Sequence, residues 1–390
     1  MQLSVIILNY NVRYFLEQCV LSVQKALENI DGEIIVVDNH SWDDSCEMMR
    51  QRFPNITLIE NKENSGFPKG NNIGVAVAQG EYLCILNPDT VVAEDTFVKV
   101  LAFAKQQADL GIVGCKLIDG TGNFLPESKR GVPTPWVAFT KITGLYKIFP
   151  NSSLFNKYYA QHISENETGK VDILVGAFMV IKRDFYLEVG GFDEKCFMYS
   201  DDIDLSYTVL QKGKSNYYFH DTSVIHYKGE STIKDGTYMR RFREAMYFFY
   251  QKHFRVSFVF DVFMRLGALF FAILKKNQAQ KVNSNTGFNI SEYILCSADE
   301  GLKNKLEKQL RKKVNQTAFL SGNKLFSHAN SLQNQIEILL DNACFSFQEI
   351  IAFLEKNKNK GYTFKIIPKL TAYMIGSNSS NDRGEVIEID

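Results

Sequence analysis

Amide and carboxylate side chains follow each of four short apolar runs in the first ninety residues of the chain. The four clusters read Asn9-Tyr10-Asn11, Asp38-Asn39, Asn64-Ser65-Gly66 and Asn87-Pro88-Asp89. Any one of them is typical of an ordinary turn, because turns favour Asn, Asp and Gly. Four such clusters in succession instead indicate one polar crevice that offers carboxylate and amide groups to a ligand.

A second group of chemically capable side chains lies further along the chain. It comprises Gly190-Gly191-Phe192-Asp193-Glu194, the acidic run Asp201-Asp202-Ile203-Asp204, and His226 at the end of a strand-like segment. Neighbouring carboxylates raise each other's pKa values, which suits a general base that works near neutral pH. Asp204 precedes a helical pattern and has the simpler interpretation of an acid at a helix N-terminus. His226 is either a metal ligand or a structural histidine.

The elements that must position these clusters alternate between strands and helices. Strands are predicted at residues 3–8, 33–38, 56–60 and 82–87. A helix is predicted between the first two strands, because every fourth residue from Phe15 to Leu27 is apolar. This order predicts an α/β fold whose mostly parallel sheet has helices on both faces, with ligands beyond the carboxyl ends of its strands. Residues 123–169 show little regular pattern and are predicted to be a long loop that shapes the binding site.

Composition restricts the class of protein. The 390 residues are 45% hydrophobic and 23% charged, which is typical of a folded chain with room for two domains. Lys plus Arg and Asp plus Glu each number 44, so the basic excess of a nucleic-acid-binding protein is lacking and we expect no nucleic acid partner. The seven cysteines have no CxxC spacing and are expected to be free thiols. No signal-peptide pattern precedes the first strand, so a cytoplasmic protein is expected.

The chain after residue 255 divides into three segments. Residues 256–276 are apolar and aromatic but include Asp261 and Arg265. They are predicted to be an amphipathic helical segment at a membrane interface or, equally, a helix packed on the first domain. Residues 277–289 read as a polar linker. Residues 290–390 are predicted to form a small Rossmann-like α/β domain, which lacks GxGxxG and Walker motifs and is interpreted as a docking or oligomerising module.

Seven segments of residues 1–255 resemble family 2 inverting glycosyltransferases of the GT-A fold, in the branch of bacterial rhamnosyltransferases and galactofuranosyltransferases. The segments are SVIILNYN (4–11), IIVVDN (34–39), NSGFPKGNN (64–72), LNPDT (86–90), VGAFMVIKR (175–183), GGFDEKCFMYSDDIDL (190–205) and VIHYKGEST (224–232). They occur in the family's order with compatible spacing. The resemblance implies a GT-A domain over residues 1–255. Such a domain would move a rhamnose- or galactofuranose-like sugar from a dTDP or UDP donor to a hydroxyl of a growing, lipid-linked bacterial glycan.

The resemblance also implies which residues bind the donor and the acceptor. The implied donor-binding residues are Asn9, Tyr10, Asp38, Asn64, Gly66, Phe67, Gly70, Asn71, Asn87, Asp89, Gly176 and Ala177. The glycines at the third cluster allow close approach of the backbone, and the helix that starts there favours phosphate. Gly70 has the alternative role of permitting tight helix–sheet packing. Gly191, Phe192 and Asp193 are expected on the acceptor side.

Catalytic and metal-binding roles follow from the same resemblance. Asp202 stands at the position of the catalytic base, with Asp201 in a positioning role beside it. Asn87-Pro88-Asp89 takes the place of a metal-binding Asp-x-Asp motif, and His226 is implied as a further ligand. One carboxylate provides too few ligands for Mn²⁺ or Mg²⁺, so the diphosphate and water are expected to complete the coordination. An imidazole ligand favours Mn²⁺.

Two other functions fit parts of the sequence. A sugar-nucleotidyltransferase should carry a Gly-rich basic loop after the first strand, where this chain has Asn9-Tyr10-Asn11-Val12. A non-catalytic sugar-nucleotide-binding assembly or regulatory subunit should have lost Asp89, Asp202 or His226, and all three are present. The chain is therefore interpreted as a metal-dependent inverting glycosyltransferase at the inner face of the cytoplasmic membrane, with residues 290–390 as a candidate surface for a homo-oligomer.

Overall fold

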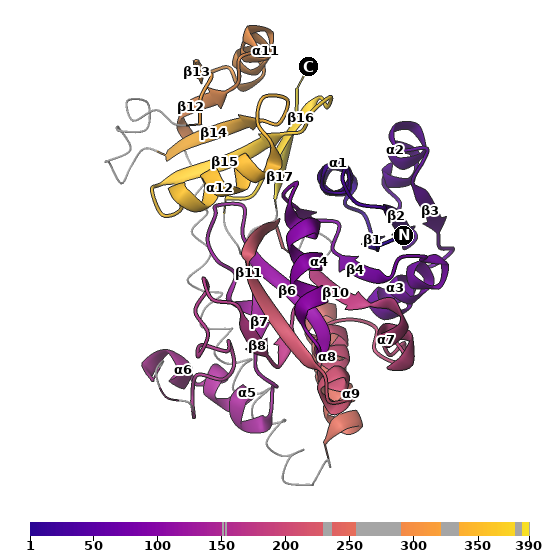
Figure 1. Ribbon diagram of the computed structural model, residues 1–390. Helices are drawn as coiled ribbons and strands as arrows, with labels where there is room; N and C mark the ends of the chain where they lie inside the picture. Colours follow the sequence, from indigo (N-terminus) through magenta and orange to yellow (C-terminus); the bar gives the residue numbers. More distant parts are fainter. Residues whose placement is uncertain are drawn as a thin grey trace.

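The computed structural model describes residues 1–149, 152, 154–228, 236–254, 290–320, 335–378 and 384–389. Within these ranges the protein is α/β, with a nine-stranded sheet in the N-terminal part and a six-stranded sheet in the C-terminal part (Figure 1). The predicted fold class is therefore confirmed. The predicted amphipathic segment 256–276 and linker 277–289 lie outside the described residues.

The first sheet is mostly parallel. Its strands are β1 (Leu3–Asn9), β2 (Gly32–Asp38), β3 (Thr57–Glu60), β4 (Tyr82–Leu86), β5 (Thr90–Val91), β6 (Leu110–Ile118), β8 (Gly169–Val171), β10 (Phe178–Lys182) and β11 (Ser215–His226). Their order is β3-β2-β1-β4-β10-β6-β11-β5, with β8 beside β11. Strands β1 to β4 pair in parallel, whereas β10 runs antiparallel to both β4 and β6. The four strands predicted before residue 90 are confirmed, each end within one residue.

Helices cover both faces of this sheet. The helices are α1 (Arg13–Ala26), α2 (Ser45–Arg52) and α4 (Thr96–Gln106) on one face, and α3 (Gly66–Val77), α7 (Arg183–Glu188) and α8 (Asp201–Gln211) on the other. Strand β1 has apolar side chains on both faces that need covering: Val5 and Ile7 pack toward α1, while Ile6 and Leu8 pack toward α3. Alternating side chains of a strand point to opposite faces, and each such buried aliphatic side chain stabilises the fold by about 1.5–3 kcal/mol.

The prediction of a long loop over residues 123–169 is wrong in part. This region contains the 3₁₀ helix η1 (Pro126–Ser128), strand β7 (Lys129–Arg130), and helices α5 (Pro135–Ile142) and α6 (Leu145–Ile148). Helix α5 starts after Thr134, whose side chain accepts the Val137 N–H, and has a proline in its first turn. Both helices are too short to show a clear apolar period in the sequence. Strand β7 pairs with β9 (Ile173–Leu174).

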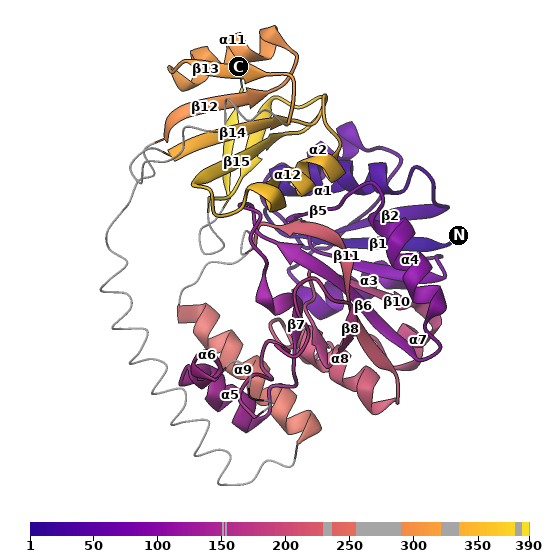
Figure 2. The same cartoon turned by 60° about the vertical axis from the view of Figure 1, so that its left-hand side comes forward.

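The second sheet belongs to the C-terminal part of the chain. Its strands, in spatial order, are β13 (Val314–Thr317), β12 (Ile290–Cys296), β14 (Gln335–Asp341), β15 (Tyr362–Ile367), β16 (Tyr373–Gly376) and β17 (Glu385–Glu388). The first four are parallel and the last two pair in antiparallel fashion. Helix α11 (Glu300–Leu310) covers one face, and α12 (Phe347–Asn357) lies between the other face and the N-terminal part (Figure 2).

The two parts share a hydrophobic core at α12. Side chains of α1, β5, β6 and β11 pack there with those of α12, β14 and β15. The Glu94 carboxylate accepts the N–H groups of Phe347 at 2.8 Å and Gln348 at 2.7 Å. These N–H groups lack partners inside the helix, so a carboxylate from the N-terminal part satisfies the start of α12. The C-terminal sheet is thus docked at the β5–β11 edge of the first sheet.

Candidate active site

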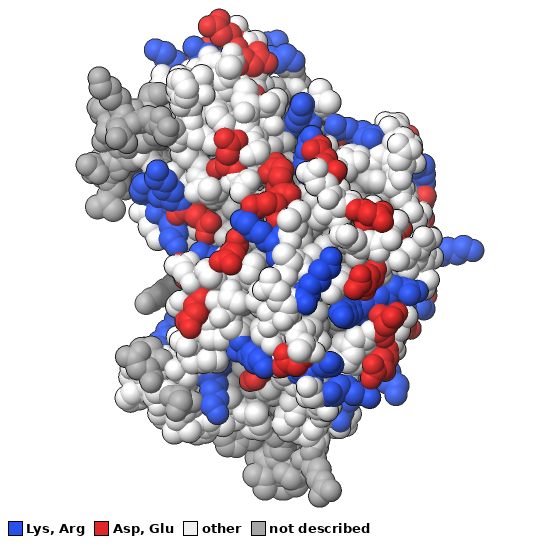
Figure 3. All heavy atoms as spheres, in the orientation of Figure 1, with Lys and Arg blue, Asp and Glu red and all other residues white. Residues whose placement is uncertain are grey.

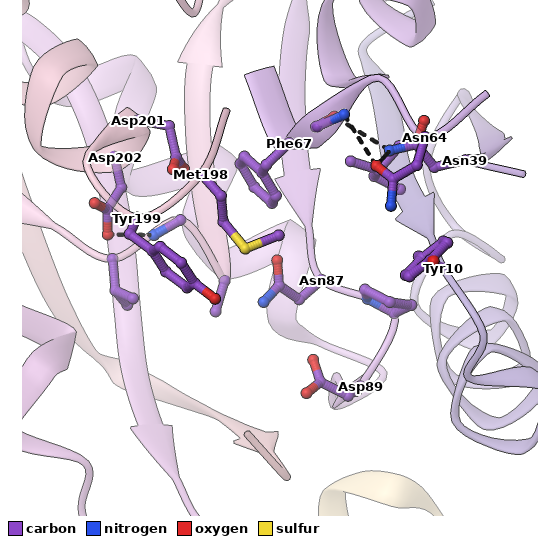
Figure 4. Close-up of a pocket in the computed structure, with 16 residues that line it drawn as sticks. Tyr10, Asn39, Asn64, Phe67, Asn87, Asp89, Met198, Tyr199, Asp201 and Asp202 are labelled. Carbon is purple, nitrogen blue, oxygen red and sulfur yellow. Dashed lines mark hydrogen bonds between the residues drawn. The ribbon is translucent and has the colours of Figure 1, made fainter. Parts of the chain in front are cut away.

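One pocket opens where strands β1, β2 and β4 end, as the order of the sheet requires (Figure 4). Six separate segments line it: Leu8, Tyr10, Asn39, Asn64, Gly66, Phe67, Asn87, Pro88, Asp89, Val175, Gly176, Ala177, Met198, Tyr199, Asp201 and Asp202. Ten of these residues belong to the set predicted from the sequence: Tyr10, Asn64, Gly66, Phe67, Asn87, Asp89, Gly176, Ala177, Asp201 and Asp202. The structure therefore brings together residues that are up to 192 positions apart.

Asn39 organises the wall of the pocket at the start of α3. Its amide nitrogen donates to Asn64 Oδ1 at 2.9 Å, and its amide oxygen accepts from the Ser65 N–H at 3.0 Å. Asn64 Oδ1 also accepts the N–H of Gly66, which has a left-handed backbone with φ of 82°. Asn39 was absent from the predicted donor set, although its position directly after β2 was a signal for it.

Asn9 and Asp38 do not line the pocket and instead bond to each other. The Asn9 amide nitrogen donates to Asp38 Oδ2 at 2.8 Å, and Asp38 Oδ1 accepts the Ser41 N–H at 2.8 Å. Both side chains are buried. They hold the ends of β1 and β2 together and support the pocket from behind.

Gly70 and Asn71, also predicted to bind the donor, lie inside the helix–sheet interface. A Cβ atom on Gly70 would lie 2.4 Å from a methyl carbon of Leu8, so this glycine permits close packing of α3 on β1. The Asn71 amide donates to the Phe67 carbonyl oxygen at 2.9 Å. The structure thus places Gly70 in the packing role that was its alternative.

Two adjacent carboxylates lie at the start of α8. Asp202 Oδ2 forms an ion pair with the Arg130 guanidinium and accepts the Gly176 N–H at 3.2 Å, and Oδ1 accepts the Ile203 N–H at 2.8 Å. Burial, and secondly the charge of Asp202, raise the pKa of Asp201 to about 7. One carboxylate of the pair is therefore held by a cation while the other titrates near neutral pH.

Sequence reasoning missed Arg130. It lies 72 positions before Asp202, on strand β7, and is almost buried. Its guanidinium also donates to the Leu174 carbonyl oxygen at 3.4 Å. A single arginine in a region without regular pattern carried no signal in the sequence.

Asp89 and His226 meet at the edge of the pocket. Strand β11 pairs with β5, and this register sets His226 opposite Thr90, directly after Asp89. His226 Nε2 lies 3.4 Å from Asp89 Oδ1 and 3.4 Å from the amide nitrogen of Asn87. Among the described residues, no three His, Cys, Asp or Glu side chains are grouped to hold a metal ion. The protein therefore offers two such donors at this place.

The predicted acceptor-side residues lie behind the pocket wall. Phe192 is buried, and its ring packs edge-on against Phe67 with 5.6 Å between the ring centres. Gly191, with φ of 64°, forms the turn before it. The Asp193 carboxylate accepts from Lys252 Nζ at 2.8 Å. Phe192 therefore supports the Phe67 ring and Asp193 contacts Lys252, and none of the three predicted residues lines the pocket.

Helix α9 (Gly236–His253) anchors the acidic run from behind. The buried Asp204 carboxylate lies 2.8 Å from Lys252 Nζ and 2.6 Å from His253 Nε2. Ser200 Oγ donates to the Ala245 carbonyl oxygen at 2.9 Å. Asp204 therefore ties α8 to α9, beyond the role of a helix N-terminal acid that the sequence indicated.

Comparisons with known proteins show which family the N-terminal part of the chain is similar to. The family model described as Glycosyl transferase family 2 matches residues 4–190. The N-acetylglucosaminyl-diphospho-decaprenol L-rhamnosyltransferase of Mycobacterium tuberculosis is 24% identical over 246 residues, which cover 60% of this chain and 78% of that protein. Rhamnosyltransferase WbbL of Escherichia coli is 27% identical over 222 residues, which cover 53% of this chain and 78% of the relative. A solved mannosyltransferase of Pyrobaculum calidifontis in complex with GDP-Man and Mn²⁺ is 18% identical, with a TM-score of 0.46, over 73% of this chain and 76% of that one. Residues 4–190 are therefore a family 2 glycosyltransferase domain, as the sequence motifs predicted.

Proposed function

We propose that this chain is an inverting glycosyltransferase. It moves a rhamnose- or galactofuranose-like sugar from a dTDP or UDP donor to a hydroxyl of a lipid-linked bacterial glycan, at the inner face of the cytoplasmic membrane. The observation that carries the proposal is the convergence of six segments on one pocket, five of them within the family 2 glycosyltransferase domain. The lipid-linked acceptor is supported by the diphospho-decaprenol in the name of the mycobacterial relative.

The layout of the pocket suits a nucleotide diphosphate sugar. Figure 4 shows Tyr10 and Asn64 on one side, Asp201 and Asp202 on the other, and Asp89 between them. We place the nucleoside beside Tyr10 and Asn64, where an aromatic ring and amide groups can contact it. The diphosphate then lies toward Asp89, and the sugar lies toward the acidic pair.

Gly176 leaves the space that the sugar ring needs. A Cβ atom at this position would lie 3.4 Å from the Asp202 side chain and 3.5 Å from the Phe67 ring. A larger side chain would therefore fill the gap between the acidic pair and the aromatic wall. The Gly176 N–H holds Asp202 at the same time.

Asp89 and His226 fit a divalent metal ion as two of its ligands. Their donor atoms, Oδ1 and Nε2, are 3.4 Å apart and both side chains are almost buried, so a single ion can contact both. An oxygen and an imidazole ligand together favour Mn²⁺ over Mg²⁺. When bound, the ion would neutralise the charge that develops on the leaving diphosphate.

Asp202 is the proposed catalytic base. As the acceptor hydroxyl oxygen bonds to the anomeric carbon, the bond to the diphosphate oxygen breaks on the opposite face and the hydroxyl proton moves to the Asp202 carboxylate. Arg130, Gly176 and Ile203 orient that carboxylate. Asp201, whose pKa burial raises to about 7, keeps its proton below that pH, so the pair carries a single charge.

A donor screen tests the proposal. The melting temperature is measured with UDP-, dTDP- and GDP-sugars, with and without Mn²⁺, because a ligand bound only by the folded state raises it. We expect one nucleotide sugar to stabilise the protein in a Mn²⁺-dependent manner, and Asp89→Asn to lose the Mn²⁺-dependent part. Asp184→Asn, on the exposed side of α7, is the matched control and should behave as wild type. If no nucleotide sugar stabilises the protein or is turned over, the proposal fails.

A further inference from the structure

Residues 128–164 form a stretch without acidic side chains in a chain whose charges balance. The protein has 44 basic and 44 acidic residues, yet this stretch contains no Asp or Glu. Of its basic residues, Lys141, Lys147 and Lys157 reach the surface, whereas Lys129 is buried and Arg130 is almost buried beside Asp202. The stretch also includes α5 and α6 and is rich in aromatic residues. Local charge of one sign beside aromatic side chains is typical of a surface that meets an anionic partner.

The stretch exposes large apolar side chains. Trp136, Ile148, Phe149 and Leu154 expose 43%, 65%, 47% and 54% of their surfaces. We call these four residues, with the exposed Lys147 and the half-buried Lys141, the α5–α6 patch. An exposed group of large apolar side chains of this kind marks an interaction site.

The patch has an ordered aromatic base. The Trp136 ring lies with its centre 5.6 Å from that of Phe139 and 5.8 Å from that of Phe155. Its indole N–H donates to the Leu154 carbonyl oxygen at 2.9 Å. The Lys141 ammonium lies 3.7 Å from the centre of the Tyr158 ring. These contacts fix Trp136 in place although almost half of it remains exposed.

The patch is connected to the acidic pair by two routes. Along the chain, Arg130, which binds Asp202, comes shortly before Trp136. Across the fold, the Tyr250 hydroxyl of α9 donates to the Pro133 carbonyl oxygen just before α5. Helix α9 in turn holds the acidic run through Asp204.

Helix α9 lies at the same end of the molecule and adds similar side chains. Figures 1 and 2 both show α5, α6 and α9 at the end opposite the C-terminal sheet. Among the side chains of α9 that the structure describes, the exposed basic and aromatic ones are Arg240, Arg241, Phe242, Arg243, Tyr247 and Lys252. By contrast, acidic and basic side chains are interspersed over the C-terminal and central parts of the face in Figure 3. One end of the protein is therefore distinguished by exposed apolar, aromatic and basic side chains.

We propose that the α5–α6 patch rests on an anionic lipid bilayer. Trp and Lys side chains favour the boundary between headgroups and acyl chains, and basic residues are attracted to the negative surface of anionic lipids. A second copy of this chain would set like charges opposite each other, which disfavours a self-association surface. The inference rests on the proposed function only in one respect: the purpose of the membrane contact would be access to a lipid-linked acceptor. The α5–α6 patch consists of described residues and does not include residues 256–276.

The two tryptophans of the chain make a direct test available. Trp42→Phe leaves Trp136 as the single tryptophan, and Trp136→Phe leaves Trp42, which is 83% exposed on the first domain. Tryptophan emission of the full chain is recorded with vesicles of phosphatidylcholine alone or mixed with phosphatidylglycerol, with and without brominated acyl chains. We expect a blue shift and bromine quenching for Trp136 with the anionic vesicles, reversed by high salt, and neither effect for Trp42. Vesicle binding without quenching of Trp136, or no binding at all, would overturn the proposal.

Surface variants distinguish the contribution of the α5–α6 patch to vesicle binding from that of the rest of the chain. Because the side chains are exposed, Phe149→Ser and Lys147→Glu should leave the fold intact, which the melting temperature checks. Each should weaken partitioning to anionic vesicles on the order of tenfold, whereas Leu370→Ser, an exposed leucine on the C-terminal part, should not. Equal binding by all variants, or equal binding to neutral and anionic vesicles, would contradict the inference. Stabilisation by nucleotide sugars should persist in every variant, so failure of this inference is distinguishable from failure of the proposed function.

Discussion

Asp201→Asn should stabilise the fold at alkaline pH. Asp201 is buried at the start of α8, and burial followed by the charge of Asp202 raises its pKa from 3.8 to about 7. Between these two values the unfolded chain has released the proton while the folded protein retains it, so stability falls as pH rises through this window. Above pH 7 the folded protein must bury a charge that the unfolded chain leaves in water. Asparagine removes that cost and keeps an amide oxygen as an acceptor.

The size of the stabilisation follows from the difference between the pKa of Asp201 in the unfolded chain and its pKa in the folded protein. A pKa raised from 3.8 to about 7 corresponds to about 4 kcal/mol at most, at 1.36 kcal/mol for each unit. Local relaxation in the folded state reduces this, and we expect about 2–4 kcal/mol above pH 7, which raises the melting temperature by roughly 5–10 °C. Near pH 4.5 most of the gain should be absent, because Asp201 is still protonated in the folded protein.

Thermal unfolding followed by circular dichroism at pH 4.5 and pH 8 measures this difference. Asp202→Asn is the matched control, because it leaves the Arg130 guanidinium without its counter-charge, which costs about 3–5 kcal/mol for a buried pair. It should lower the melting temperature at both pH values. If Asp201→Asn lowers the melting temperature at pH 8 as much as at pH 4.5, the burial argument for Asp201 is refuted.

Three further changes have expected outcomes. Arg130→Gln should lower kcat with little change in donor KM, because the Asp202 carboxylate loses the guanidinium that orients it. Arg130→Lys should restore part of kcat. Glu94→Gln should destabilise the fold by about 1 kcal/mol in thermal unfolding, since two N–H groups of α12 lose their charged acceptor. Gly176→Val should raise the Kd of the nucleotide sugar by about tenfold or more in titration calorimetry while the bare nucleoside diphosphate binds as before; equal weakening of both would contradict the position given to the sugar.

The sequence predicted those parts of the fold that depend on local pattern. Strands β1, β2 and β4 are largely buried on both faces, so each is rich in Ile, Val and Leu and stands out from its polar flanks. Because these strands are parallel, their polar ends meet at one edge of the sheet, and Tyr10, Asn64 and Asp89 therefore share a pocket.

Contacts between distant segments could not be predicted in this way. The pairing of Arg130 with Asp202 depends on a β7–β9 ribbon formed by very short strands. The capping of α12 by Glu94 joins residues 253 positions apart. Asn9 and Asp38 lie at strand ends as predicted, but their side chains satisfy each other because both are buried beside the turn at Ser41. The position of a residue at a strand end therefore predicts that it lies near the site. It does not predict whether its side chain faces the ligand.

Release of nucleoside diphosphate during sugar transfer tests the central claim most directly. The nucleotide sugar that stabilises the protein is mixed with a lipid-linked glycan acceptor and Mn²⁺, and the released nucleoside diphosphate is measured against time. We expect turnover by the wild type and by Asp184→Asn, and a kcat at least about a hundredfold lower for Asp202→Asn, which should still bind the donor. Wild-type turnover by Asp202→Asn would contradict its role as the base, and the absence of release by the wild type with every donor and acceptor would contradict sugar transfer itself.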